Sequence, residues 1–263
     1  MNRSIGFSTG ALAFGNFRLA LDMLRGYQVN AVELSALRQP ELDPLCRAVH
    51  DLDLSQYDYV AVHAPSEIVP AMELHVVTCL LDLAERGWPI IVHPDAIHDY
   101  ALWRRFGALL CVENMDKRKP VARTVDELRS VFDVLPEASF CLDLGHGRQV
   151  DATMTEVYWM IRAFGAKIRQ IHVSEVNTRS KHDRLSDASV FAFKRVAEYI
   201  PENIPLIVEA VIDEPDISSE LQRVEEALLK PLRVPQAWRN REENRGGRRH
   251  LLGRLCSIRM NSV

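Results

Sequence analysis

Short runs of apolar residues recur along the chain, each followed by a longer segment with helical periodicity. A parallel strand that is buried on both faces is expected to appear as such a continuous apolar run. The predicted strands lie at residues 4–8, 31–34, 59–63, 90–93, 109–113, 140–143, 168–172 and 204–209. Eight alternations of strand and helix predict right-handed βαβ units that close as a (β/α)8 TIM barrel. A doubly wound open sheet is the alternative, but no glycine-rich phosphate loop follows the first strand.

Six of the eight predicted strands end in a residue that can bind a metal. These residues are His63, His93, Glu113, Asp143 (with His146 three positions later), His172 and Glu209. Barrel enzymes carry their chemistry at the carboxyl ends of their strands. Side chains alternate across a strand, so ligands that point into the barrel mouth would have Ala61, Cys111 and Cys141 in the layer below them. The pattern predicts a metal site at the mouth of the barrel.

Each of these residues alone has an ordinary structural explanation. A single histidine at a strand end is more often a hydrogen-bonded structural residue, and a single glutamate is often a salt-bridge partner. Three carboxylates at one small barrel mouth, however, would repel one another and raise each other's pKa values. A divalent cation removes that conflict. The mixture of carboxylates and imidazoles favours Zn or Mn, with Co and Fe(II) also suited and Mg requiring fewer imidazole ligands.

Composition is consistent with one large domain, since 263 residues with 47% hydrophobic content suit a full barrel core. The five cysteines are dispersed and show no CxxC spacing, which predicts reduced thiols in a cytoplasmic protein. The N-terminal residues contain no long apolar segment, and no run of about 18 apolar residues occurs, so neither a signal peptide nor a membrane span is expected.

Charge divides the chain into two regions. Residues 231–263 contain eight arginines and two glutamates, a net charge of +6. The whole chain has a net charge of −4, so residues 1–230 have a net charge of −10. We therefore expect a barrel over residues 1–230 and an arginine-rich C-terminal extension over 231–263. The extension is interpreted as a solvated segment or one that packs in a homo-oligomer, in preference to a contact with nucleic acid or an acidic partner.

The ordered set of strand-end motifs resembles the xylose isomerase-like barrels, which include sugar isomerases, sugar epimerases and the endonuclease IV type. The resemblance covers about residues 4–210 and rests on Val-His63-Ala-Pro, Val-His93-Pro, Val-Glu113-Asn, Leu-Asp143-Leu-Gly-His146, Ile-His172-Val-Ser-Glu175 and Val-Glu209. In the epimerases, the resemblance implies one metal held by Glu113, Asp143, His172 and Glu209. Glu113 and Glu209 would also move protons, and His146 would contact the substrate.

In the endonuclease IV members, the resemblance implies a second zinc on His63 and His93 with Glu113 as the bridge. A third zinc there uses His146 and an Asp-x-His pair after the seventh strand. This chain has Ser180 where the aspartate of that pair is expected, two residues before His182. The pair is incomplete, and His182 is either a ligand or a solvated loop residue.

The preferred functional hypothesis is a metal-dependent isomerase or epimerase of a small sugar or sugar phosphate, which works by proton transfer through a metal-stabilised enediolate. Glu113 and Glu209 would act as base and acid, while His146 and Arg179 would hold substrate oxygens. The alternative is metal-assisted phosphodiester hydrolysis of the AP endonuclease family 2 kind, which His63 and His93 favour. Nucleic acid is the less favoured partner, because the segments after the early strands carry little positive charge.

A third hypothesis is a barrel that binds a ligand without catalysis. The complete carboxylate set argues against it, because a metal site with no use has no reason to be complete.

Overall fold

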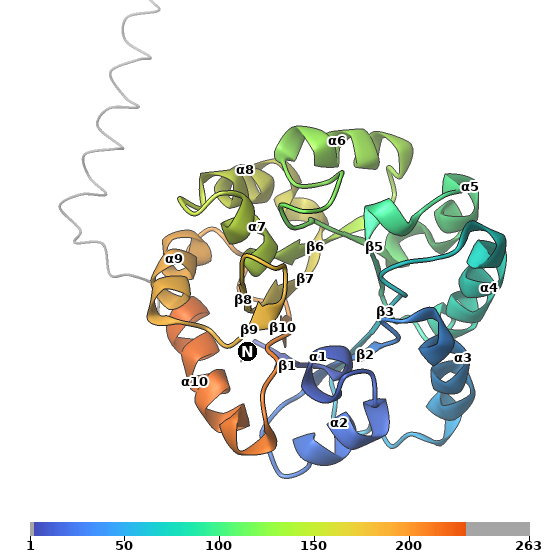
Figure 1. Cartoon of the computed structure of the whole chain (residues 1–263), viewed down its shortest axis with the longest axis horizontal. Helices are drawn as coiled ribbons and strands as arrows, with labels where there is room; N and C mark the ends of the chain where they lie inside the picture. Colours follow the sequence, from blue (N-terminus) through green and yellow to red (C-terminus); the bar gives the residue numbers. More distant parts are fainter. Residues whose placement is uncertain (1–2, 230–263) are drawn as a thin grey trace, which may run out of the picture. The chain divides into compact units, whose positions relative to one another are not determined.

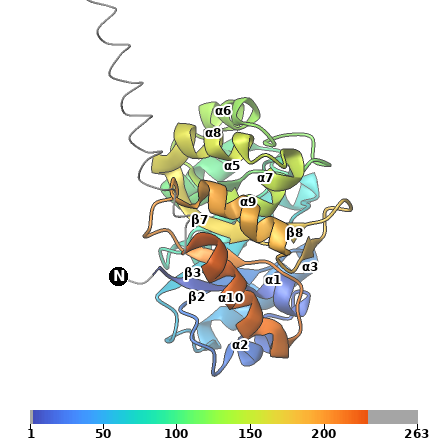
Figure 2. The same ribbon diagram turned by 90° about the vertical axis from the view of Figure 1, so that its left-hand side faces the viewer.

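The computed structural model describes residues 3–229 and forms a closed barrel of parallel strands in the order β1-β10-β7-β6-β5-β4-β3-β2, ringed by helices (Figure 1). The predicted (β/α)8 barrel is confirmed. The barrel strands are β1 Ile5–Ser8, β2 Ala31–Ser35, β3 Tyr59–His63, β4 Ile90–Val92, β5 Leu110–Glu113, β6 Ser139–Asp143, β7 Ile168–Val173 and β10 Leu206–Val208. An antiparallel hairpin of β8 Glu175–Val176 and β9 His182–Asp183 projects at one end of the barrel (Figure 2).

The helices lie outside the strands. They are α1 Thr9–Ala13, α2 Phe17–Leu24, α3 Gln39–Ala48, α4 Glu73–Ala84, α5 Tyr100–Trp103, α6 Val125–Val134, α7 Leu144–Val150, α8 Thr155–Phe164, α9 Asp187–Ala197 and α10 Ile217–Leu228. Shorter 3-10 segments occupy Val49–Asp51, Pro70–Met72, Pro94–Ala96, Arg104–Leu109, Gly165–Lys167 and Glu214–Asp216. Helix ends follow local chemistry: the Thr124 side chain accepts a hydrogen bond from the Glu127 amide at the start of α6, and Gly87, with φ +79°, follows the end of α4.

The apolar core has two parts. The larger part fills the space between the strands and the helices, as is usual for this fold. The smaller part lies inside the barrel and consists of Ala61, Ile91, Cys111 and Cys141, with Tyr59 packed against it. The predicted layer of small side chains beneath the strand-end ligands is therefore present.

Three elements were not predicted: α1, α7 and the β8–β9 hairpin. They are short, and their shape depends on contacts with other parts of the chain. Helix α7 starts directly at the predicted ligand Asp143, whose side chain accepts a hydrogen bond from the His146 amide at 2.6 Å. Gly145 lets α7 approach β7 closely, since a Cβ there would lie 2.6 Å from the Ser174 carbonyl oxygen.

The predicted boundary at Pro231 and the arginine-rich extension lie outside the described residues. In the described part of the chain, no helix is both long and apolar enough to cross a membrane.

Candidate metal centre

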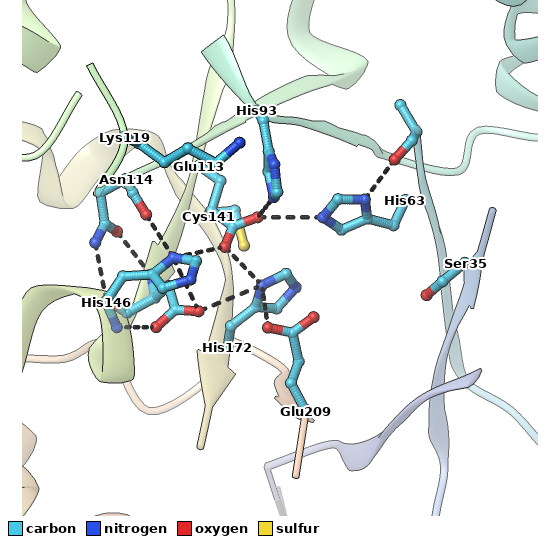
Figure 3. Close-up of polar contacts among 12 residues, drawn as sticks. Ser35, His63, His93, Glu113, Asn114, Lys119, Cys141, His146, His172 and Glu209 are labelled. Atoms are coloured by element: carbon cyan, nitrogen blue, oxygen red, sulfur yellow. Dashed lines mark hydrogen bonds and ion pairs between the residues drawn. The ribbon is translucent and has the colours of Figure 1, made fainter. Parts of the chain in front are cut away.

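Four side chains from four different strands converge at the carboxyl end of the barrel. Glu113, Asp143, His172 and Glu209 place one ligand atom each within 4.8 Å of the others. Figure 3 shows Glu113, His172 and Glu209 pointing toward one another. His172 Nδ1 lies 3.1 Å from Glu209 Oε2 and 3.3 Å from Glu113 Oε1, with Asp143 Oδ2 at 4.0 Å. All four residues are buried. The structure thus brings together the complete predicted core set.

Two further histidines approach the other oxygen of Glu113. His63 ends β3 and His93 follows β4, and their Nε2 atoms lie 3.2 Å and 3.5 Å from Glu113 Oε2. The opposite oxygen, Oε1, faces His146 and His172. Glu113 therefore stands between two groups of ligands, which is the arrangement of a carboxylate that can bridge two ions.

A third group forms at the rim of the cluster. His146, on α7, places Nδ1 at 3.3 Å from Asp143 Oδ2, and these two residues and His182 have ligand atoms within 4.8 Å of one another. His182 Nδ1 also lies 2.8 Å from Ser174 Oγ and 3.6 Å from Glu209 Oε2. His182 thus lies next to the other candidate ligands, and its binding to an ion stays a prediction.

Ser180 and Arg179 lie away from the ligand cluster. Ser180 donates its hydroxyl hydrogen bond to Asp116 and so ties the β8–β9 hairpin to the segment after β5. Arg179 is exposed, and its carbonyl oxygen accepts a hydrogen bond from Arg118 at 2.7 Å. Within residues 3–229, no contact joins the Arg179 side chain to the ligands, so its contact with substrate remains a prediction.

Sequence reasoning missed Glu33, which is fully buried in β2 and lies opposite Ala61 in the register with β3. Its Oε2 accepts hydrogen bonds from His172 Nε2 at 2.8 Å and from Gln170 Nε2 at 2.7 Å. Tyr59 in turn donates to Gln170 Oε1 at 2.7 Å. An outer carboxylate of this kind orients a ligating imidazole, here so that Nδ1 faces the cluster. The sequence signal that could have identified Glu33 is a glutamate inside an otherwise apolar strand. A glutamate is almost never fully buried without a partner, so this position predicts a buried polar contact.

Asn114 is a second residue whose role the motif alone did not reveal. Its side-chain amide donates to the Asp143 carbonyl oxygen at 2.9 Å, and its Oδ1 accepts from the Asp143 backbone N–H at 2.7 Å. The Asn114 carbonyl oxygen lies 3.0 Å from His146 Nδ1. Asn114 therefore fixes the backbone of one candidate ligand and contacts the ring of another.

The buried charges perturb one another strongly. Burial alone would raise the pKa of Glu113, but the charge of His172 and the neighbouring imidazoles of His146 and His63 hold it well below its usual range. Burial raises the pKa of Asp143 to about 7, against the opposing charge of His146. Burial would lower the pKa of His146, yet the charges of Asp143 and Glu113 raise it to about 10. The carboxylates thus require positive charge, and without an ion imidazolium groups provide it.

Two buried atoms at the centre of the cluster make no hydrogen bond: Asp143 Oδ2 and His172 Nδ1. Buried polar atoms are normally hydrogen-bonded, so each such exception requires an explanation. Both atoms face the same small region, and one is a carboxylate oxygen while the other is an imidazole nitrogen. A transition-metal ion bound there would satisfy both, so the residues fit the metal that the fold implies.

Two basic side chains follow the ligand-bearing strands β5 and β6, and both form ion pairs. Lys119 follows β5 and pairs with Asp95 at 2.8 Å, while Arg148 on α7 pairs with Glu175 at 3.3 Å. Their positive charges are therefore balanced by neighbouring carboxylates.

Comparison with known proteins shows similarity in structure only. No protein-family model matches the chain, and a search of curated protein sequences also finds no match. Among solved structures, the IolI protein with a bound zinc atom has a TM-score of 0.61 at 11% identity, covering 88% of this chain and 100% of that one. The 3-keto-D-glucoside 4-epimerase YcjR from E. coli has a TM-score of 0.51 at 12% identity, with 86% and 99% coverage.

An AP endonuclease of family 2 from Brucella melitensis has a TM-score of 0.52 at 13% identity, with coverage of 84% and 99%. At these identities the comparison establishes the fold and not the reaction. The chain shares the (β/α)8 barrel fold of these three proteins, as the strand pattern predicted.

Proposed function

We propose that this protein is a divalent-metal-dependent isomerase or epimerase of a small sugar or sugar phosphate. One observation carries the proposal: two carboxylates from different strands, Glu113 and Glu209, approach the same ligand atom, His172 Nδ1, at 3.3 Å and 3.1 Å. Two carboxylates on either side of one substrate can remove a proton and return one, which is the chemistry that isomerases and epimerases need.

Glu113, Asp143, His172 and Glu209 would hold the ion. When bound, it supplies Lewis-acid stabilisation of the negative charge that develops on substrate oxygens. Glu209 is the better candidate for the base, because both oxygens of Glu113 are already contacted by histidines. Burial opposes ionisation of Glu209, but in the protein without an ion the charge of His172 lowers the pKa of this carboxylate to about 2.

In the proton transfer, the Glu209 carboxylate takes a proton from the carbon next to the substrate carbonyl, and the electrons of that C–H bond move toward the carbonyl oxygen. Glu113 is itself ionised, so the returning proton comes from the protonated His146 and passes through Glu113 to the opposite face of that carbon, while the electron pair moves back from the oxygen. In an isomerisation the proton reaches the neighbouring carbon instead, and the hydroxyl proton of that carbon moves to the former carbonyl oxygen. The His146 imidazole, 3.1 Å from Glu113 Oε1, can replace the proton that Glu113 delivers. His146 is also positioned for a hydrogen bond to a substrate hydroxyl.

Burial of the site supports a small substrate. The side chains of Glu113, Asp143, His172 and Glu209 are between 0% and 9% exposed, whereas His93 and His182 at the rim are 12% and 26% exposed. A polymer would need a wider approach to the centre than this. The structural similarity to the 3-keto-D-glucoside 4-epimerase YcjR agrees with a sugar substrate, and the zinc atom bound by IolI agrees with a metal site.

Phosphodiester hydrolysis is the second candidate, and the two histidines on Glu113 Oε2 favour it. Hydrolases of this kind use two ions about 3.5–4 Å apart, which stabilise the attacking and the leaving oxygen. His63 and His93 would hold the additional ion. The structural similarity to a family 2 AP endonuclease agrees with this alternative.

The two candidates differ in metal count and in reaction. If the protein is an isomerase or epimerase, we expect Glu113→Gln to remove one equivalent of metal from the purified protein. We also expect the wild type to exchange the substrate α-proton with deuterated water in a panel of ketoses and sugar phosphates. The hydrolase is supported instead if Glu113→Gln loses two equivalents of metal, if His63→Ala loses one, and if the wild type cleaves bis-p-nitrophenyl phosphate. No loss of metal in Glu113→Gln would refute both.

A further inference from the structure

A second group of metal-binding side chains lies outside the barrel, on the neighbouring helices α3 and α4 (Figure 1). Asp43 and Cys46 are three residues apart on α3, and His75 and Cys79 are four residues apart on α4. Both spacings place the two side chains on the same face of a helix, one turn apart. Each helix therefore presents a pair of metal-binding groups.

Three of these groups are already close together. Cys79 Sγ lies 3.6 Å from Asp43 Oδ1 and 3.6 Å from His75 Nε2, and the last two atoms are 2.8 Å apart. Tetrahedral zinc, with bonds of about 2.3 Å to sulfur and 2.0–2.1 Å to nitrogen or oxygen, requires about 3.5 Å between a sulfur ligand and its neighbours. The two contacts of Cys79 match that edge length. The shorter contact between His75 and Asp43 is a hydrogen bond that an ion would replace.

Cys46 is the fourth candidate ligand, one helical turn from Asp43 on α3. Its Sγ lies 3.8 Å from the Cys79 carbonyl oxygen, and both cysteines are partly buried free thiols. Two sulfurs, one imidazole and one carboxylate form a donor set of the kind that zinc binds, in contrast to the oxygen and nitrogen ligands of the barrel mouth. The side chains of His75 and Asp43 are 48% and 47% exposed, so an ion can reach them from solvent.

We propose that Asp43, Cys46, His75 and Cys79 form a second zinc site, separate from the barrel mouth, which joins α3 to α4. Four protein ligands leave no open position, so the site is structural. A redox pair of the same two cysteines is the main alternative. Zinc binding would use Asp43 and His75 as well, whereas a disulfide between the two cysteines would not.

Cobalt(II) tests the proposal, because it substitutes for zinc and shows a near-ultraviolet charge-transfer band only when thiolates bind it. The full-length protein is freed of metal under reducing conditions and titrated with cobalt. We expect the band to saturate at one equivalent and to fall by at least about half in Cys79→Ser and in Cys46→Ser, because each variant removes one of the two thiolates. Glu113→Gln, which alters the barrel site, should leave the band intact.

Cys141→Ser is the matched control, since Cys141 is a thiol close to Glu113 and His172 in the barrel. If the band is lost in Cys141→Ser and kept in Cys79→Ser, or never forms, the proposal is wrong. His75→Asn provides a measurement that retains both thiols. We expect it to weaken zinc binding by more than about 100-fold in a chelator competition, because losing even an outer partner of a ligand costs about 10–100-fold. Unchanged affinity in that variant would also overturn the proposal.

Discussion

At the residue scale, the contact between Glu33 and His172 explains how a histidine deep in the barrel presents one defined nitrogen to the cluster. The imidazole has two nitrogens, and the partner of one decides what the other does. Glu33 Oε2 lies 2.8 Å from His172 Nε2, which leaves Nδ1 for Glu113 and Glu209. The side chain that sets this orientation therefore lies one layer below the candidate ligands.

We expect Glu33→Gln to weaken metal binding by about 10–100-fold, the usual cost of losing such an outer partner. The glutamine keeps the shape of the side chain but removes the charge that holds the imidazole N–H. Metal affinity, measured by competition with a chromogenic chelator, checks this prediction. Glu67→Gln, an exposed glutamate elsewhere, is the control and should leave affinity unchanged. Equal affinities for the two variants would show that Glu33 has no orienting role.

At the element scale, the β8–β9 hairpin is held over the barrel mouth by contacts with three other segments. Glu175 accepts hydrogen bonds from the Ser186 amide at 3.0 Å and the Ser189 hydroxyl at 2.7 Å, which attach β8 to the start of α9. Arg148 on α7 pairs with the other oxygen of Glu175. The hairpin carries His182, so these contacts determine where that imidazole lies.

We predict that Glu175→Gln lowers the free energy of unfolding by about 1–2 kcal/mol at pH 7, because hydrogen bonds to a charged group are lost. Burial raises the pKa of Glu175, but the hydrogen bonds from Ser186 and Ser189 bring it below its ordinary value. The stabilisation is therefore present above the unfolded pKa of about 4.3 and is lost as the pH falls through the lowered value.

Urea unfolding of wild type and variant across this pH range measures the difference. The difference should shrink as the pH falls below about 4.3. The exposed residue Glu198 provides the control variant Glu198→Gln, for which no such trend is expected. A difference that stays constant with pH would contradict the assigned hydrogen bonds.

The sequence predicted the elements whose pattern is set locally and missed those set by tertiary contacts. Eight buried strands each leave a continuous apolar run, so the barrel and the strand-end residues could be predicted. Helix α7 and the hairpin are too short to leave a periodic pattern, and α7 depends on the close packing of Gly145 against β7. A glutamate inside the apolar strand β2 was the sequence signal for Glu33, but its place beneath the cluster follows from its register opposite Ala61, which the sequence does not show.

At the scale of the whole molecule, the barrel keeps several carboxylates and imidazoles buried together, and a bound ion should stabilise the fold. An ion that binds only the folded state adds about 2.7 kcal/mol at a free concentration of 100 times Kd. For a domain of this size that corresponds to a rise in Tm of about 5–10 °C.

Thermal unfolding in the Cys79→Ser background, which isolates the barrel from the proposed outer site, checks this prediction. Adding Glu113→Gln to that background should abolish the rise. If zinc and manganese both leave the Tm of the Cys79→Ser protein unchanged, the barrel mouth does not hold an ion in the folded state.

The pairing of β10 with β1 closes the barrel and also determines when the complete ligand set forms. Glu209 follows β10, and β10 joins β1 through the pairs Ile5↔Leu206, Gly6↔Ile207 and Phe7↔Val208. During synthesis, therefore, the last of the four carboxylate and imidazole groups emerges only after almost the entire barrel has been made. A partial chain offers an ion an incomplete set of ligands, so the ion cannot act as an early template for folding. The metal is expected to enter last, through the mouth of a barrel that is already closed.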